Sequence, residues 1–449
     1  MGYARWATKE EKLNISIPVN LDTGVKKSGV PFMYDDNYLN LLNNNYHTLV
    51  IGSTGSGKTQ SIVLPMLKLS AEAGESVVVS DPKGEIYKIT ADILEKKGYK
   101  VSVINFDNPN FGNSFNPLIL PYNLYKNGNK DKAMELIEDI GYYLLYDKKD
   151  LSDPFWVNSA INYFTGLVLY LFENAKEEEI NLVSVASLAN DLNEKDSAQK
   201  FMEKIDKNSS IYVNISGILL APPETRGSII AVFNQKIKLY ISRESLSNML
   251  SFTNFDFRNL SNEKSVLFLV GGTTFASERL IPLVINQVYN AIDLYGNKEK
   301  IVNILLDEFD SLLPIKNFSR VITSLRGMYT RITVIVKSYM DLINVYGKED
   351  TEILKSCFQN IVYLISSDIN TLEEISKMCG KTLEEGIEKP LIDVEDLKHL
   401  DIFEAVILVI REMPIKTKLL PDYKIDWGYK SVEKEIPERK PNNIQIFKY

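Results

Sequence analysis

The stretch Gly52-Ser53-Thr54-Gly55-Ser56-Gly57-Lys58-Thr59 follows the G-x-x-x-x-G-K-[ST] pattern of a Walker A phosphate loop. In this pattern the glycines let backbone N–H groups turn toward the phosphates, the lysine reaches the β- and γ-phosphates, and the threonine hydroxyl ligates Mg²⁺. The apolar run Thr48–Ile51 predicts a buried strand before the loop, and Ser61–Ala71 predicts a helix after it, with its N-terminus facing the anion. The loop therefore predicts binding of a nucleoside triphosphate, ATP, together with Mg²⁺.

A second apolar run, Ile301–Leu306, ends in two carboxylates and predicts a Walker B strand of the ATPase type. Asp307 is expected to hold Mg²⁺ through water, alongside Thr59, and Glu308 is expected to orient and deprotonate the attacking water. Adjacent side chains on a strand point to opposite faces, so the strand must end or twist here for both carboxylates to reach one site. A kinase does not need a carboxylate at Glu308, but a hydrolase does. Together with the phosphate loop, the two carboxylates favour an ATP-hydrolysing site. The alternative is a strand that simply ends in an acidic turn.

Two further residues complete the expected catalytic set of Lys58, Glu308, Arg326 and Lys337. Lys337 stands at the tip of the next predicted strand, where ATPases of this kind often sense the γ-phosphate; a strand-end charge in solvent explains it equally well. An arginine from a neighbouring subunit commonly neutralises charge in the transition state, and Arg326 is the first candidate. The weaker candidates are Arg331, Arg226 and Arg279.

The composition limits the size of the protein and the classes of protein to which it can belong. The chain has 449 residues, of which 45% are hydrophobic, so it can bury a large core and form two or three domains. Its net charge of −8 excludes a uniformly basic coat for nucleic acid. The two cysteines and two histidines have no metal-ligand spacing, and no run of about 18 apolar residues predicts a membrane span. These features predict a soluble cytoplasmic body.

The order of strand-like and helical patterns predicts the architecture. Strands alternate with helices up to about residue 106, helical patterns then dominate, and strands resume at about residue 265. This rhythm predicts an α/β P-loop domain with a doubly wound, mainly parallel sheet, interrupted by an all-α domain. The expected divisions are 1–121 and 256–420 for the two parts of the nucleotide-binding domain, 122–255 for the inserted all-α domain, and 421–449 for a surface or partly disordered tail.

Along nearly its whole length the chain resembles the type IV secretion coupling proteins of conjugation, the VirD/TraG/TraD class. The segments that carry this resemblance, in the order of the family, are Met1–Glu11, His47–Thr59, Val79–Glu85, Ser114–Leu118, Pro154–Ala160, Leu306–Asp310 and Ile361–Gly380. The sequence departs from the family at Lys337, where glutamine is usual, and in lacking the two transmembrane helices. Trimming after the membrane anchor is the favoured explanation of the second difference.

The resemblance implies a RecA-like, homohexameric ATPase at the cytoplasmic face of the membrane, with ATP at the subunit interfaces. Such a protein recruits a relaxase–single-stranded DNA complex, or protein effectors, to the components of a secretion channel and powers DNA transfer. Without its anchor the body is expected to be largely monomeric. The helical domain is the expected docking surface for protein substrates, and Lys236–Arg243 is a candidate for DNA contact, although a solvated helix face is favoured there.

Two alternative functions remain open from the sequence. An FtsK/HerA-like DNA translocase is disfavoured by the helical insertion near Phe155–Ala160 and by the Asp81–Glu85 signature. A substrate receptor would use ATP only as a structural switch. Asp81 itself has two interpretations, as a contact to the water shell of Mg²⁺ or as part of a turn that begins the following helix.

Overall fold

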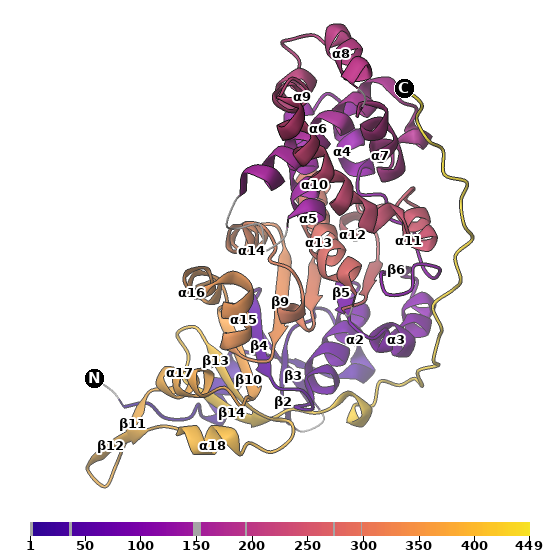
Figure 1. The fold of residues 1–449 in the computed structure, drawn as a ribbon. Coiled ribbons are helices and arrows are strands. Elements are labelled where there is room, and N and C mark those ends of the chain that lie inside the picture. The colour runs from indigo at the N-terminus through magenta and orange to yellow at the C-terminus, as the bar shows by residue number, and fades with distance from the viewer. Residues whose placement is uncertain (1–2, 36–37, 147–153, 194, 273, 298) are drawn as a thin grey trace. The chain divides into compact units, whose positions relative to one another are not determined.

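The computed structural model describes residues 3–35, 38–146, 154–193, 195–272, 274–297 and 299–449. The chain divides into two compact units, and each unit is discontinuous in sequence (Figure 1). Unit 1 comprises Met1–Val103, Phe257–Thr273 and Tyr289–Ile436. Unit 2 comprises Ile104–Asp256, Thr274–Val288 and Pro437–Tyr449.

The sheet of unit 1 has nine strands in the order β14-β13-β10-β4-β9-β8-β5-β7-β6. Their bounds are β4 (Thr48–Gly52), β5 (Ser76–Asp81), β6 (Lys100–Asn105), β7 (Ser265–Val270), β8 (Val302–Leu306), β9 (Thr330–Val336), β10 (Asn360–Ile365), β13 (Glu404–Val409) and β14 (Ile415–Lys418). The strands from β10 to β7 pair in parallel, whereas β13 and β14 are antiparallel additions at one edge. Strands β4, β5, β7, β8 and β9 are buried along their whole length, as expected of parallel strands covered on both faces. The predicted α/β class with a mainly parallel sheet is confirmed.

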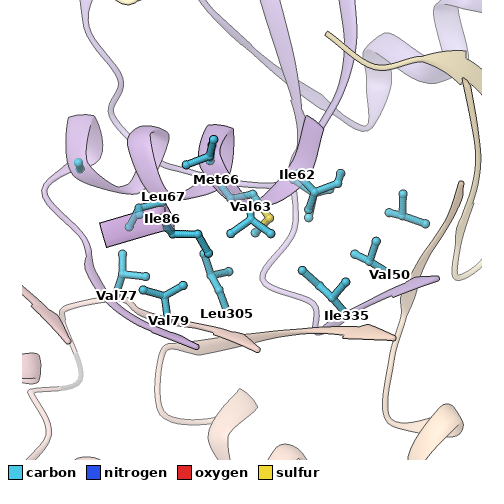
Figure 2. Packing of buried hydrophobic residues seen from close by; sticks show 14 of the residues in the cluster. Val50, Ile62, Val63, Met66, Leu67, Val77, Val79, Ile86, Leu305 and Ile335 are labelled. Carbon is cyan, nitrogen blue, oxygen red and sulfur yellow. The ribbon is translucent and has the colours of Figure 1, made fainter. Parts of the chain in front are cut away.

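Helices connect these strands. Those of unit 1 are α1 (Lys9–Asn14), α2 (Leu64–Ala73), α3 (Glu85–Lys96), α12 (Asn259–Asn262), α14 (Phe318–Arg326), α15 (Tyr339–Tyr346), α16 (Lys348–Ser356), α17 (Ile369–Cys379) and α18 (Val394–Lys398). A π-helical turn, Thr59–Val63, precedes α2, and Gly74 ends α2 with a left-handed φ of 73°. Residues of this turn and of α2 are buried in one apolar cluster with residues of β4, β5, β8 and β9, as Figure 2 shows for Val63, Val50 and Leu305. This core holds the helix that follows the phosphate loop on the sheet.

Several short elements of unit 1 were not predicted. They are the antiparallel sheet of β1 (Ser16–Val19), β3 (Tyr38–Leu42) and β2 (Pro31–Asp35), the hairpin of β11 (Lys381–Glu384) and β12 (Ile387–Pro390), and the 3₁₀ turns Leu21–Thr23, Phe309–Ser311 and Asp422–Lys424. In the family-like segment at the N-terminus, Thr8 and Glu11 form a capping box on α1. The first two residues of that segment, Met1 and Gly2, lie outside the described residues.

Unit 2 is built from helices. They are α4 (Ile119–Lys126), α5 (Lys130–Leu145), α6 (Pro154–Asn174), α7 (Leu182–Asp191), α8 (Lys195–Lys204), α9 (Ser210–Leu219), α10 (Pro223–Ile241) and α11 (Glu244–Met249), with a 3₁₀ turn at Glu177–Glu179. Helix α13 (Phe275–Tyr295) begins in unit 2 and ends in unit 1. Among the described helices, α6 alone is long and apolar enough to cross a membrane, but 61% of its apolar window is buried. It packs against α5, α7, α9 and α10, as the core helix of this unit.

The units differ from the predicted divisions at three places. Unit 2 starts at Ile104 and also takes in Thr274–Val288 and Pro437–Tyr449. The tail, expected on the surface from residue 421, starts with a buried residue, because Asp422 pairs with Lys68 of α2 at 2.7 Å. The indole N–H of Trp427 donates to the other oxygen of this carboxylate at 3.0 Å. A buried carboxylate needs such partners, and this pair fixes the tail to the helix after the phosphate loop.

One buried residue makes the stability of the fold sensitive to pH. The imidazole of His47, at the entrance to β4, is 1% exposed and its Nδ1 accepts from the backbone N–H of Ile332 at 3.0 Å. Burial lowers the pKa of His47 to about 4. Because the unfolded chain takes up this proton below about pH 6.5 and the folded chain only below about pH 4, the stability falls as the pH drops through that window.

We expect His47→Gln to reduce the loss of unfolding free energy between pH 6.5 and 4 by up to about 3 kcal/mol. Urea unfolding at several pH values measures this slope. The other histidine, His399, is exposed, and His399→Gln is the matched control for the loss of one imidazole. Equal slopes for wild type and His47→Gln would contradict the assignment.

Candidate nucleotide-binding and catalytic site

Strand β4 delivers the phosphate loop at the carboxyl edge of the sheet. The strand ends at Gly52, and the loop then turns through two left-handed glycines, Gly55 and Gly57, with φ of 83° and 87°. L-residues rarely adopt this conformation, so both positions favour glycine. The backbone N–H of Ser53 donates to the carbonyl of Ile365 at 2.8 Å, which ties the start of the loop to the end of β10.

Two glycines of the loop also lie in close contacts. A Cβ on Gly52 would stand 2.6 Å from the Ser56 hydroxyl, and a Cβ on Gly57 would stand 2.5 Å from the ring of Phe403. Phe403 itself has a left-handed φ of 69° and was not singled out from the sequence. The Ser56 hydroxyl is buried and has no hydrogen-bond partner in the part of the chain that the structure describes, so it is an unused polar group on the wall of the loop. This arrangement fits a phosphate-binding cradle.

Lys58 lies folded over its own loop. Its ammonium donates to the carbonyl oxygens of Gly52 at 2.5 Å and Ser53 at 2.9 Å. Burial lowers the pKa of Lys58, and the negative charges of Asp307, Asp310 and Glu308 counteract that effect. The lysine and the Walker B carboxylates therefore lie close enough to interact.

The Walker B strand ends where the two carboxylates begin. Strand β8 stops at Leu306, and Glu308 adopts a left-handed φ of 49°. The strand alternation is therefore broken between Asp307 and Glu308, which is the condition that the sequence imposed on their use in one site. The backbone N–H of Glu308 donates to the Asp307 carboxylate at 2.9 Å, and the Ser80 hydroxyl at the end of β5 donates to the Asp307 carbonyl at 2.9 Å.

Burial raises the pKa values of two carboxyl groups, Asp307 and Asp81, at this edge of the sheet. Asp307 is 7% exposed, and burial raises its pKa, opposed mainly by the charge of Lys58. Burial also raises the pKa of Asp81 to about 6, despite a hydrogen bond from the backbone N–H of Tyr87 at 2.8 Å. That bond anchors the first turn of α3, so the helix-starting interpretation of Asp81 holds. The charge of Asp307 adds to the shift, and Asp81 therefore also borders the candidate metal position.

Lys337 follows β9, the strand between β4 and β8 in the sheet. Its ammonium pairs with Asp310 at 3.0 Å. Burial by itself would lower the pKa of Lys337, but the hydrogen bond and charge of Asp310 outweigh it and raise the pKa. Lys337 is thus held at the site instead of extending freely into solvent. Asp310 ends the family-like segment Leu306–Asp310, but no role was predicted for it from the sequence. Its second oxygen is buried without a hydrogen-bond partner among the described residues. The close spacing of Asp307, Glu308 and Asp310 was the available signal.

A cavity of about 460 Å³ adjoins the phosphate loop. Its wall consists of Ser53–Ser56 of the loop, of Leu364–Ser367 at and after the end of β10, and of Lys398, Leu400, Asp401 and Ile402 at and after the end of α18. Small-molecule sites have volumes of this order. The sequence predicted the phosphate loop but not this cavity, because the segments that line it lie some 300 residues apart along the chain.

The four arginine candidates lie in different settings. Arg326, exposed at the end of α14, stands over the Tyr46 ring at 5.1 Å. Tyr46 precedes β4, so Arg326 lies at the amino edge of the parallel strands, opposite the phosphate loop of its own chain. Arg331 is buried in an ion pair with Glu75, and Arg279 is buried with its guanidinium on the Tyr146 carbonyl and the Phe275 ring. Burial and pairing exclude Arg331 and Arg279 as arginine fingers. The fourth candidate, Arg226, lies half-buried on α10 of unit 2.

The basic–aromatic stretch Lys236–Arg243 is less suited to DNA than its sequence indicates. It forms the end of α10 and the residues after it, and its one aromatic residue, Tyr240, is fully buried with its hydroxyl donating to the Leu144 carbonyl at 3.2 Å. A buried ring is not available for base stacking. The favoured interpretation of this stretch as an ordinary helix face agrees with its structure.

Comparisons with known proteins identify the family. The model of the family "Type IV secretory system Conjugative DNA transfer" matches residues 5–386, and the chain belongs to this family. The resemblance drawn from the sequence motifs is therefore confirmed. No curated protein sequence matches the chain significantly.

Solved structures show the same fold. The bacterial conjugative coupling protein TrwBdeltaN70 is similar at 13% identity and a TM-score of 0.67, over 98% of this chain and 96% of that chain. TrwB in complex with ADP and Mg²⁺ is similar at 14% identity and a TM-score of 0.68, with the same coverage. VirB4 of Thermoanaerobacter pseudethanolicus is similar at 14% identity and a TM-score of 0.53, over 88% of this chain and 98% of that chain. The expected RecA-like P-loop fold is confirmed.

We expect Lys58→Ala to weaken ATP binding about thirtyfold, because a charge-assisted hydrogen bond contributes about 2 kcal/mol. Titration with a fluorescent ATP analogue measures the dissociation constant. Lys96, exposed on α3, provides the control, since Lys96→Ala removes an equal charge away from the loop. Unchanged affinity in Lys58→Ala would contradict the assignment of the loop.

Proposed function

We propose that this protein is the ATP-hydrolysing coupling protein of a conjugative type IV secretion system, with ATP and Mg²⁺ as its ligands. Family membership supports the role in conjugative DNA transfer. The observation that carries the enzymatic part is the grouping of Lys58, Asp307, Glu308 and Lys337 after the neighbouring strands β4, β8 and β9. The complexes of the similar protein TrwB with ADPNP, and with ADP and Mg²⁺, support the choice of ligands.

Each residue of the site has a defined task in this proposal. Gly52–Thr59 cradles the phosphates, and the adjoining cavity accepts the nucleoside. Thr59 and Asp307 supply the hard oxygen atoms that Mg²⁺ prefers, and the ion, when bound, neutralises charge on the phosphates. Glu308 takes a proton from the water that attacks the γ-phosphorus, and ADP leaves. Lys58 and Lys337 place positive charge where the γ-phosphate becomes more negative.

We expect Glu308→Gln to lower kcat by about 10²–10⁴-fold while ATP affinity stays within about threefold, because only the general base is removed. Phosphate release and analogue titration separate the two effects. Glu278→Gln on α13, a glutamate in unit 2, serves as the control for loss of one carboxylate.

The same variant distinguishes a pump from a receptor. If Glu308→Gln supports DNA transfer in mating assays at the wild-type frequency, ATP serves only as a switch and the receptor alternative replaces the pump. If transfer is lost while substrate binding remains, hydrolysis powers transfer.

The position of Arg326 supports assembly into a ring. It lies at the edge of the sheet opposite its own phosphate loop, so it serves another subunit's nucleotide and not its own. We infer a homohexamer on this basis and on the family resemblance, with relaxase–single-stranded DNA and the secretion channel as partners and the cytoplasmic face of the membrane as its location. If the arginine comes from a neighbouring subunit, the isolated monomer hydrolyses ATP slowly.

We expect Arg326→Ala to lower kcat on the order of 10³-fold in the assembled protein, as loss of a trans arginine does. Mixing Arg326→Ala with Glu308→Gln tests the trans geometry, since each inactive chain supplies the group that the other lacks. Recovery of activity on mixing supports the proposal. Arg320→Ala, earlier on the same helix, is the matched control. Absence of recovery under assembling conditions would show that Arg326 does not act across an interface.

A further inference from the structure

The C-terminal segment Pro437–Tyr449 lies extended on unit 2, and Figure 1 shows it in yellow with its end beside α7 and α8. It contains no helix, and its one strand-like contact is a bridge between Glu438 and Phe111. Most of its side chains are exposed. It is held by hydrogen bonds to its backbone and by a few anchoring side chains.

Polar side chains of unit 2 bind this backbone at residues 442, 445 and 447. The amide of Asn248 contacts residue 442 twice, donating to the Asn442 carbonyl at 2.6 Å and accepting from the Asn442 N–H at 3.1 Å. The amide of Asn181 donates to the Gln445 carbonyl at 2.8 Å. The hydroxyl of Ser184 accepts from the Phe447 N–H at 3.0 Å.

These three side chains are deeply buried, with exposures of 7% for Asn248 and 0% for Asn181 and Ser184. Buried polar groups are costly unless they are hydrogen-bonded, so groups placed to meet a peptide backbone form a binding surface and not a chance contact. Because they contact main-chain atoms, they accept an extended peptide with little regard to its sequence at those positions.

Three side chains of the segment act as anchors. The Arg439 guanidinium donates to the Pro109 carbonyl at 2.6 Å and to the Asn248 side-chain oxygen at 2.5 Å. Phe447 and Tyr449, two residues apart, pack against Tyr170 with ring centroids 6.2 and 6.1 Å away. Tyr449 also contacts Phe201 and lies under the ammonium of Lys204.

A cavity of about 380 Å³ remains beside the segment, lined by Asn442–Gln445, by Glu177 and Glu178, and by Ile119 and Ser251–Thr253. The segment therefore leaves room along its binding surface. A segment whose own side chains are mostly exposed, and which is held by hydrogen bonds and few apolar contacts, opens more readily than a packed core.

We propose that this surface, defined by Asn181, Ser184, Asn248, Tyr170 and Phe201, is a peptide-binding groove whose resident occupant is the chain's own segment Pro437–Tyr449. The partner that the resident segment excludes is an extended polypeptide with a basic residue and a pair of aromatic residues two positions apart. Release of the resident segment opens the groove to that partner. Peptide binding at this groove does not depend on ATP hydrolysis, so its test is independent of the test of the proposed function.

The test uses the full chain with a weakened resident segment. The triple variant Arg439→Ala, Phe447→Ala, Tyr449→Ala removes the anchors but leaves every residue of the groove intact. Fluorescence anisotropy with a labelled synthetic peptide of residues 437–449 measures access to the groove. We expect the triple variant to bind the peptide at least tenfold more tightly than the wild-type chain does, because the resident segment no longer competes effectively.

Further variants assign the binding to the groove. Adding Asn248→Ala to the triple variant should abolish peptide binding, whereas adding Asn190→Ala, at an exposed position near the end of α7, should not. Circular dichroism confirms that each variant is folded. Equal affinity of the wild-type chain and the triple variant, binding that survives Asn248→Ala, or no binding by a folded triple variant would each overturn the proposal.

Discussion

The parallel pairing of β4, β9 and β8 is the constraint on which the site depends. Their register places Ile51 beside Val336 and Leu306 beside Val334, so all three strands finish at one edge. The phosphate loop, Lys337 and the Walker B carboxylates are the residues that follow. Parallel strands are joined by long connections, so these residues come from three distant parts of the chain. The pairing of the strands is what brings them together. Burial then acts on the charges collected there, lowering the pKa of Lys58 and raising that of Asp307.

Two lysines offset the negative charge of the carboxylates at the site. Lys58 interacts with the Walker B carboxylates, and Lys337 is held by Asp310. A partly buried site cannot hold the three carboxylates Asp307, Glu308 and Asp310 without positive partners, so the two lysines have a structural task in addition to a chemical one. This explains how lysine can stand at a strand tip where the family usually has glutamine: Asp310 provides the partner that a charged residue needs.

Local patterns were sufficient to predict the buried strands and the phosphate loop. Strands β4 and β8 begin and end within one residue of the expected runs Thr48–Ile51 and Ile301–Leu306, because continuous apolar runs bounded by polar residues leave few alternatives. The short strands β1, β2 and β3 were missed because they lack a continuous apolar run. Phe403 against Gly57, the ion pair of Lys68 with Asp422, and the buried state of Arg331 depend on long-range packing. The tail was expected on the surface, and its binding to unit 2 is set by buried amides more than 190 residues earlier in the chain.

Phosphate release from ATP by the purified chain, measured over a range of protein concentrations with and without Mg²⁺, tests whether this site is an ATPase that a neighbouring chain completes. We predict hydrolysis that requires Mg²⁺ and a rate per chain that rises with concentration, because the site lies at one edge of the sheet and Arg326 at the other. Hydrolysis that persists without Mg²⁺, or no phosphate release at any concentration at which the chains assemble, would contradict it.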